Sequence, residues 1–250
     1  MKQSLAWLTS RPLAHRGLHD PSAGIIENTA SAFRAAIEAG YGIECDVQLS
    51  RDGEAMVHHD DTLWRLMQQP ERVADMTAAD LQQLRYRDCA DRMLTLAELC
   101  ALIGGRVPLA VEIKSHFDRD LRLTRRVIEI LAEYDGPAAA MSFDPEVVRA
   151  LRKLAPHLPR GIVAEWRYRH EEWKRISRIG KLKLALLLHA PWTRPLFVAY
   201  QVRELPSPAP YIARAFGLPL LTWTVRSAED RRHAARWADQ MIFEGFRPAA

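Results

Sequence analysis

Charged side chains recur at a two-residue spacing in two short apolar stretches of this chain. Glu44 and Asp46 enclose one residue of the first stretch, and Glu112 and Lys114 enclose one residue of the second. Successive side chains of a β-strand point to opposite faces, so each pair would project from the same face of its strand. Charges gathered on a strand face are costly unless they are paired or bind an ion. The pattern favours a metal or phosphate site, and three carboxylates are hard oxygen ligands suited to Mg²⁺, Ca²⁺ or Mn²⁺.

Histidines at the ends of neighbouring apolar segments add the parts needed for acid–base chemistry. His15 and Arg16 end the first segment, and His59 follows a predicted hairpin. His58 alternates with His59, so we expect it to point away from the site and to be structural. A lone histidine at a strand end is more often structural than catalytic, and a Glu-x-Asp pair often marks a solvated edge. Their convergence at the ends of three consecutive strands favours one shared site.

Short apolar strands alternate with amphipathic helices along the chain, which predicts an α/β domain with a parallel sheet. The expected strands are Pro12–His15, Gly42–Leu49, Pro108–Lys114, Ala138–Phe143, Arg160–Ala164, Phe197–Val202, Leu218–Val225 and Gln240–Glu244. Eight strands with helices between them in 250 residues match a (β/α)₈ TIM barrel. A doubly wound open sheet is the alternative, but no GxGxxG motif follows the first strand. In a barrel, the charged residues above would meet at the carboxyl ends of the strands.

Amphipathic segments predict the helices, and one region breaks their alternation with the strands. The expected helices are Thr29–Ala39, Leu96–Ile103, Leu121–Glu133, Pro145–Leu154, Glu171–Leu188, Pro210–Phe216 and Ala228–Trp237. Asp52-Gly53 predicts a hairpin turn and Ala55–His58 a returning strand. A loop-rich excursion with a short helix after Thr77 follows, so a small hairpin and loop insertion is expected after the second strand. Residues 1–250 show no repeat or linker and are expected to form one domain.

Composition excludes several classes of protein. Hydrophobic residues make up 48% of the chain and charged residues 26%, which argues against disorder. The net charge of +4 is spread along the sequence, which suits an anionic small-molecule substrate and predicts no nucleic-acid partner. Three cysteines without CxxC spacing indicate a reducing, cytoplasmic location. No apolar run reaches the ~18 residues of a membrane span, and Met1–Pro12 is too polar for a secretory signal. No integral membrane segment is therefore expected.

A series of motifs extends through nearly the whole chain. They are His15-Arg16-Gly17, Glu27-Asn28-Thr29, Glu44-x-Asp46-Val47-Gln48-Leu49-Ser50-x-Asp52-Gly53, His59-Asp60-Asp61-Thr62-Leu63, Glu112-Ile113-Lys114, Ser142-Phe143-Asp144 and Trp223-Thr224-Val225. This series closely resembles the glycerophosphodiester phosphodiesterase family. The resemblance implies a (β/α)₈ barrel and a metal-dependent phosphodiesterase that releases an alcohol and glycerol 3-phosphate from deacylated phospholipids.

The resemblance also implies a role for each matching position. Glu44, Asp46 and Glu112 would hold the divalent ion, and His15 and His59 would act as general acid and base, in an order that stays open. The chemistry needs such parts, because a phosphodiester repels an attacking oxygen until cations draw off charge. An alkoxide also leaves poorly unless it is protonated, and each proton transfer contributes about 10²–10⁴-fold.

Further positions near these motifs have a substrate-binding or a structural interpretation. By the same resemblance, Arg16 and Lys114 would bind phosphate oxygens. Trp223, at the end of the seventh predicted strand, is interpreted either as an apolar wall over the glycerol or leaving group or as a core tryptophan. Asn28 is interpreted either as a polar contact near the site or as a helix cap. Asp60 is interpreted as a cap or turn residue outside the main site.

The C-terminal segment departs from the pattern that the resemblance implies. Members of the family commonly end the last strand with Thr-Asp and a proline-containing turn, whereas this chain has Met241-Ile242-Phe243-Glu244-Gly245-Phe246-Arg247-Pro248. The change leaves the metal ligands in place but puts substrate selection in doubt. Two alternatives stay open: a phospholipase D-type enzyme acting on lysophospholipids, and a catalytically silent barrel that binds a phosphorylated metabolite or partner protein. The sequence does not indicate the oligomeric state of the protein.

Overall fold

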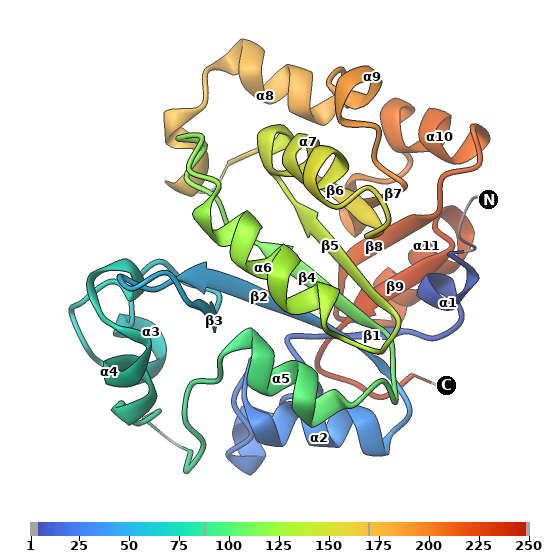
Figure 1. The fold of residues 1–250 in the computed structure, drawn as a ribbon. Coiled ribbons are helices and arrows are strands. Elements are labelled where there is room, and N and C mark those ends of the chain that lie inside the picture. The colour runs from blue at the N-terminus through green and yellow to red at the C-terminus, as the bar shows by residue number, and fades with distance from the viewer. Residues whose placement is uncertain (1–4, 88, 170, 249–250) are drawn as a thin grey trace.

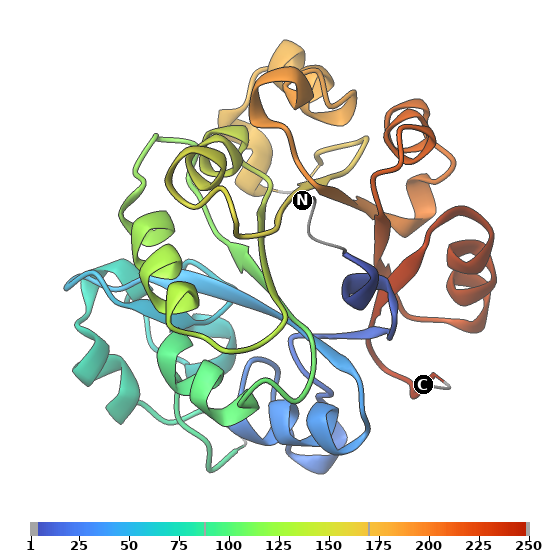
Figure 2. The same cartoon turned by 45° about the vertical axis from the view of Figure 1, so that its right-hand side comes forward.

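The computed structural model describes residues 5–87, 89–169 and 171–248, and in it eight parallel strands close into a barrel (Figures 1 and 2). These strands are β1 (Leu13–His15), β2 (Gly42–Leu49), β4 (Leu109–Ile113), β5 (Ala138–Ser142), β6 (Arg160–Ala164), β7 (Phe197–Gln201), β8 (Leu220–Val225) and β9 (Gln240–Phe243). Each pairs with its neighbour in parallel, and β1 pairs with both β9 and β2, which completes the ring. The predicted TIM barrel is confirmed.

The register of the strands places the candidate residues at one rim. His15 of β1 lies opposite Glu44 of β2. Asp46 of β2 lies opposite Glu112 of β4. Between the two acids, Cys45 points to the other face and joins the apolar layer under the helices. The two-residue spacing therefore sorts acids to the barrel interior and the thiol to the helical layer.

Most of the helices that cover the barrel begin at a side-chain cap. They are α2 (Ala30–Glu38), α5 (Leu96–Ile103), α6 (Arg122–Ala132), α7 (Pro145–Leu154), α10 (Pro208–Ala215) and α11 (Ala228–Trp237). Thr95 and Glu98 form a capping box at the start of α5, in which each side chain accepts a backbone N–H of the other residue. Asp144 caps α7 and Ser227 caps α11. Two 3₁₀ turns, η1 (Pro21–Ala23) and η4 (Val202–Glu204), lie in loops.

The insertion after β2 forms as predicted. β3 (Ala55–Val57) returns antiparallel to β2 after a turn in which Gly53 has a φ of 90°, a value that favours glycine. The excursion then contains α3 (Trp64–Met67), the 3₁₀ turn η2 (Val73–Asp75) and α4 (Ala78–Gln83). A separate apolar cluster that includes Met56 holds this excursion together. The excursion thus has an apolar cluster of its own, whereas Ala55 and Val57 of β3 pack in the apolar layer under the barrel helices.

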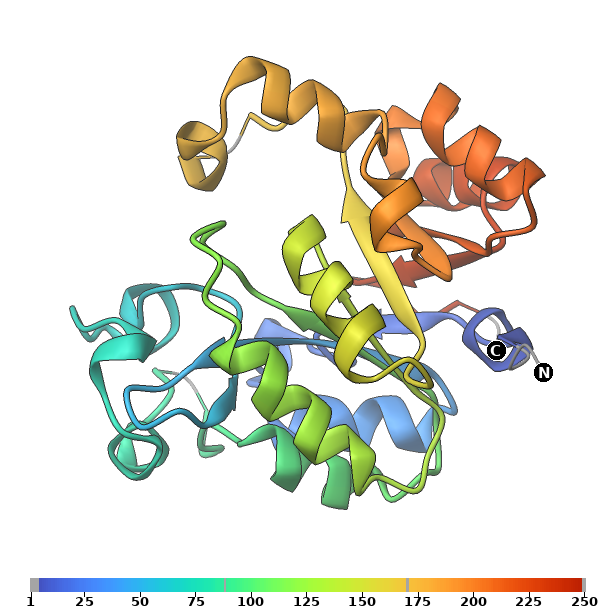
Figure 3. The ribbon, with the colours of Figure 1, turned by 45° about the horizontal axis from the view of Figure 1, so that its top comes forward.

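The connection between β6 and β7 differs from the prediction of one helix over Glu171–Leu188, which is wrong. The segment contains the 3₁₀ turn η3 (Glu171–Arg175), α8 (Arg178–Ala185) and α9 (Ala190–Thr193). The predicted helix is interrupted at Ser177. The side chain of Ser177 accepts a hydrogen bond from the backbone N–H of Gly180 and so starts a new helix. Figure 3 shows this segment in gold, reaching past the end of the barrel toward which β2 points.

The barrel interior is filled by small and large apolar side chains and closed at one end by the N-terminal helix. Leu8 of α1 (Ala6–Thr9) packs in this cluster with Phe197 of β7 and Met141 of β5. Figure 2 shows α1, in dark blue, at the end of the barrel. Among the described residues, none of the helices combines the length and apolar character needed to cross a bilayer.

Replacement of Gly161 by alanine should destabilise the fold by about 1–3 kcal/mol, the usual cost of overpacking a core. A methyl group at this position of β6 would overlap the buried ring of Phe197 on the neighbouring strand. Urea unfolding followed by circular dichroism measures the change. In a Phe197→Leu background the same glycine substitution should cost less, because the ring it displaces is gone. Equal costs in the two backgrounds would contradict this packing argument.

Candidate active site

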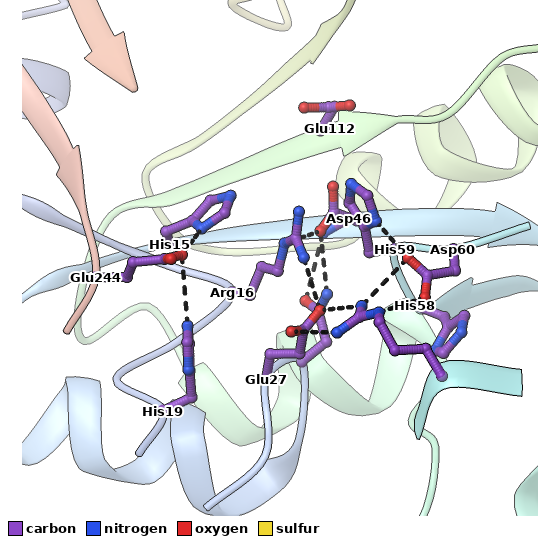
Figure 4. A network of polar contacts seen from close by, with 12 residues as sticks. His15, Arg16, His19, Glu27, Asp46, His58, His59, Asp60, Glu112 and Glu244 are labelled. Atoms are coloured by element: carbon purple, nitrogen blue, oxygen red, sulfur yellow. Dashed lines mark hydrogen bonds and ion pairs between the residues drawn. The ribbon is translucent and has the colours of Figure 1, made fainter. Parts of the chain in front are cut away.

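Three buried carboxylates meet at the carboxyl ends of neighbouring strands. Glu44 and Asp46 of β2 and Glu112 of β4 each offer an oxygen atom, and these three atoms lie within 4.8 Å of one another. The three residues are 2%, 1% and 8% exposed. Figure 4 shows Asp46 and Glu112 projecting into the same space. The geometry fits a site for a hard divalent cation, which would balance the repulsion among the acids.

The electrostatics of the carboxylates depend on which cations are near each one. Burial raises the pKa of Glu44 well above its usual value, and the charges of Asp46 and Glu112 raise it further. Burial also acts to raise the pKa of Asp46, but the charges of Lys114, His59 and nearby Arg16 outweigh it and hold that pKa well below its usual value. The Nζ atom of Lys114 lies 2.7 Å from Asp46 Oδ1 and 2.5 Å from Glu112 Oε1. Asp46 and Glu112 therefore share the positive charge of Lys114 between them.

Arg16 ties the first strand to the carboxylates through its backbone and its side chain. Its backbone N–H donates to Glu44 Oε2 at 3.1 Å, and its Nε lies 3.1 Å from Asp46 Oδ2. Its Nη1 lies 2.7 Å from Glu27 Oε1. Arg16 has a φ of 57°, and this left-handed conformation directs both contacts inward. The guanidinium is therefore held at the edge of the carboxylate cluster.

Asn28 is buried against Asp46 and supports it. Its Nδ2 donates to Asp46 Oδ2 at 3.1 Å, and its Oδ1 accepts the backbone N–H of Asp46 at 3.4 Å. The cap of α2 is the neighbouring Thr29, whose side chain accepts the N–H of Ala32. Of the two sequence interpretations of Asn28, the structure favours the polar contact near the site.

His15 is paired with an acid from the C-terminal strand region. Its Nδ1 lies 2.5 Å from Oε2 of Glu244, and its Nε2 lies 4.0 Å from Glu44 Oε2. Burial lowers the pKa of His15 to about 4 in spite of the nearby carboxylates. Glu244 also contacts Arg226 Nε at 2.5 Å and His19 Nε2 at 3.7 Å. The unusual C-terminal motif thus places its acid on His15, with Nε2 of that ring turned toward the carboxylate cluster.

His59 has the same kind of partner from its own loop. Its Nδ1 lies 2.7 Å from Asp60 Oδ1, and Asp60 in turn contacts Arg65 Nε at 2.6 Å. Arg65 continues to Glu27 Oε1 at 2.7 Å, so the network reaches back to Arg16 (Figure 4). The interpretation of Asp60 as a turn residue outside the site is wrong. His58 points away, with its Nε2 3.4 Å from a loop carbonyl oxygen.

One cavity of about 830 Å³ joins these groups. Both carboxylate-paired histidines, the three acids and the two cations line it. Its far wall is aromatic: Trp223 meets Phe143 edge to face with ring centroids 5.5 Å apart, and Phe143 meets Trp173 at 4.8 Å. Trp223 is therefore at the cavity wall rather than only in the core. The volume exceeds what a single phosphate needs and leaves room for two substituents.

Sequence reasoning placed the main site residues but missed two acids. The predicted ligands, histidines and cations all line the same cavity, whereas their chemical roles stay predictions. Glu244 was missed because it is 229 positions from its partner His15. Asp60 directly follows His59, and a carboxylate next to a candidate catalytic histidine is a signal that could have found it.

A glycerophosphoryl diester phosphodiesterase family model matches residues 15–246. The chain belongs to this family. The match begins at His15 and extends past Glu244, so it includes the three acids, both histidines and the two cations of the site. The family resemblance of the sequence motifs is thereby confirmed.

Two curated relatives in the family are similar over part of their length. The glycerophosphodiester phosphodiesterase of Caldanaerobacter subterraneus subsp. tengcongensis is 34% identical over 161 residues, covering 60% of this chain and 65% of the relative. A probable glycerophosphodiester phosphodiesterase 1 of Mycobacterium tuberculosis is 32% identical over 171 residues, covering 59% of this chain and 61% of the relative. The aligned part spans less than two thirds of each relative.

Solved structures share the fold over nearly the whole chain. The glycerophosphodiester phosphodiesterase of Thermotoga maritima has a TM-score of 0.71 and 26% identity, covering 92% of each chain. An Oleispira antarctica phosphodiesterase, solved with the product sn-glycerol-3-phosphate, has a TM-score of 0.77 and 20% identity, covering 95% of this chain and 94% of that one. The second likeness supports the fold alone.

Proposed function

We propose that this protein is a metal-dependent phosphodiesterase that hydrolyses glycerophosphodiesters to glycerol 3-phosphate and an alcohol. The observation that carries the proposal is one cavity lined by three clustered carboxylates and two carboxylate-paired histidines. Membership of the family and the named activity of the Caldanaerobacter relative support it. The Oleispira phosphodiesterase binds sn-glycerol-3-phosphate, the product expected here.

The carboxylates and cations would act on the phosphate group. Glu44, Asp46 and Glu112 would hold a divalent ion, with Mg²⁺ or Ca²⁺ preferred and Mn²⁺ possible, because oxygen ligands suit these metals. When bound, such an ion supplies positive charge that offsets the charge of the phosphoryl oxygens. Arg16 and Lys114 border the same space and would bind the remaining phosphate oxygens. The negative charge that repels an attacking oxygen would thereby be offset.

The two histidines would move the protons. One of His15 and His59 takes a proton from water as its oxygen bonds to phosphorus, and the other gives a proton to the departing alcohol oxygen as the P–O bond breaks. Glu244 and Asp60 each accept from the Nδ1 side of their histidine, which leaves Nε2 for the substrate. In Figure 4, Arg16 and Asp46 lie between the two rings, as an in-line reaction at a phosphate held there would need.

The rest of the cavity would select the organic groups. Trp223 and Phe143 form an apolar wall suited to the glycerol carbons or the leaving alcohol. The three free cysteines, Cys45, Cys89 and Cys100, support a reducing, cytoplasmic location. Pairing of β1 with β9 joins the two ends of the described chain and supports a single domain over 1–250.

A screen of glycerophosphodiesters with each metal tests the proposal. Purified protein is incubated with glycerophosphocholine, glycerophosphoethanolamine and glycerophosphoglycerol, each with Mg²⁺, Ca²⁺, Mn²⁺ or a chelator. Glycerol 3-phosphate should appear together with the free alcohol, and the chelator should stop its formation. Tight binding of a diester with no product over long incubation would instead support the catalytically silent barrel.

A further inference from the structure

An exposed apolar and basic surface lies on the connection between β6 and β7, beside the cavity described above. We call it the α8 surface. It consists of Trp166, Arg175, Arg178, Ile179, Leu182 and Lys183, all of them exposed. Ile179 is 68% exposed, Leu182 is 50% exposed and Trp166 is 44% exposed. Large apolar side chains grouped on one surface commonly mark an interaction site.

The helix α8 is apolar on two faces, and one of them has no covering element in the described part of the chain. Leu184 and Ala185 are buried against the barrel, with Leu184 in a cluster that includes Trp173. Ile179, Leu182 and Lys183 follow one another at helical spacing on the other face, which is turned to solvent. Packing against the barrel therefore accounts for the first set of apolar residues but not for the second.

Positive charge is concentrated in the segment of the chain that contains these apolar residues. Residues 166–194 contain eight lysines and arginines and two glutamates, a net charge of +6, whereas the whole chain has a net charge of +4. The rest of the protein is therefore slightly acidic, and the charge is not a general property of its surface. A partner with a negative surface is favoured at this location.

The surface adjoins the mouth of the catalytic cavity. Trp173, Arg175 and Ile176, which directly precede α8, line the cavity. Lys181 Nζ donates to the carbonyl oxygen of Tyr168 at 2.9 Å, which fixes the helix to the loop that contains Trp166. Figure 3 shows this segment reaching past the barrel end where the strands end. A body bound to the α8 surface would thus face the opening through which substrate enters.

We propose that the α8 surface binds an anionic lipid bilayer, with the mouth of the cavity turned toward the headgroup layer. Aliphatic and tryptophan side chains enter the boundary between headgroups and acyl chains, while lysine and arginine contact anionic headgroups. A nucleic acid would pair with the positive charges but would leave the apolar side chains of Ile179 and Leu182 exposed to solvent. A second copy of this chain would bring like charges together. This inference concerns a surface separate from the proposed catalytic residues, so its failure and a failure of the proposed function can be told apart.

Vesicle co-sedimentation of the full chain tests the proposal. Vesicles of phosphatidylcholine alone are compared with vesicles that also contain phosphatidylglycerol. Binding should be strong only with phosphatidylglycerol. The double variant Ile179→Ser/Leu182→Ser should bind about 10-fold more weakly or worse, because much of two apolar side chains would no longer be buried. The double variant Arg178→Glu/Lys183→Glu should lose about fivefold or more for each positive charge removed.

Matched variants elsewhere on the surface control for general stickiness and net charge. Ile212→Ser/Phe216→Ser removes comparable exposed apolar side chains from α10, and Arg231→Glu/Arg232→Glu removes two exposed positive charges from α11. Phe216 is at the end of α10 that leads to the start of β8, away from the cavity mouth. Both controls should bind vesicles like the parent.

Three results would overturn the proposal. One is the absence of binding to the anionic vesicles. Another is equal weakening by the α8 and the control variants. The third is a dimer, seen by light scattering, that the serine variant dissociates without any change in vesicle binding. Because binding is read without substrate, none of these results depends on catalytic activity.

Discussion

Replacement of Glu44 by glutamine should remove the stabilisation of the protein by divalent metal and lower phosphodiesterase turnover about 100-fold or more. The ligand set would lose one of its three charges, and a bound ion is worth several kcal/mol of transition-state stabilisation, at 1.36 kcal/mol for each tenfold in rate. The glutamine oxygen can still accept the backbone N–H of Arg16, so local structure should be kept. Thermal unfolding with and without Mg²⁺ or Ca²⁺, alongside the rate, measures both effects.

The parent and variant should differ both in their response to metal and in their stability without it. At about 100 times the Kd, metal should stabilise the parent by about 2.7 kcal/mol and the variant hardly at all. Without metal the variant should be at least as stable as the parent, because Glu44 no longer repels Asp46 and Glu112. Glu129→Gln, on the exposed side of α6, is the matched control and should keep the metal response. A full metal response in Glu44→Gln would show that the ion binds elsewhere.

Replacement of His15 or of His59 by alanine should lower turnover of glycerophosphocholine by about 10²–10⁴-fold, the usual contribution of a general acid or base. The two variants should separate on a p-nitrophenyl diester of glycerol phosphate. The nitrophenolate leaves without being protonated, so the variant that lacks the general acid should recover most of its rate. The variant that lacks the general base should not recover. Comparison of kcat for the two substrates assigns the two roles.

The carboxylate partners of the histidines give a graded check. Glu244→Gln and Asp60→Asn keep the hydrogen-bonding shape but lose the charge that orients each ring, and should cost about 10- to 100-fold, a part of the same contribution. His157→Ala, at an exposed position, is the control and should have no effect. If both histidine variants were slowed equally on both diesters, neither histidine would be the general acid.

Local sequence patterns were sufficient to predict the barrel and the charged residues at the centre of the cavity. The placement of Glu44, Asp46 and Glu112 at one rim was predictable because a strand has a period of two, and because parallel strands in a barrel end at the same rim. Caps such as Thr95 and Ser227 also act within one turn of a helix, so their partners are close in the sequence. Such short-range rules need no knowledge of the rest of the fold.

The failures arose where the outcome depends on competition or on distant parts of the chain. In Glu171–Leu188 the apolar and basic pattern suits one helix, yet Ser177 starts a new helix and the preceding turn packs into the cavity. The interruption of the helix goes together with the contact of Trp173 with Phe143, and this long-range contact cannot be predicted from the local sequence. The same break creates the exposed face of α8.

The sequence by itself determined the order of the strands, the barrel, and the rim at which three acids, two histidines and two cations meet. Only the tertiary structure decided which charged side chains pair with one another around the site. Closure of β1 against β9 brings Glu244 to His15, and the long-range arginine network joins Asp60 to Arg16. The physical reason is that secondary structure follows from interactions a few residues apart, whereas a hydrogen-bond partner is chosen only when the ring of strands closes.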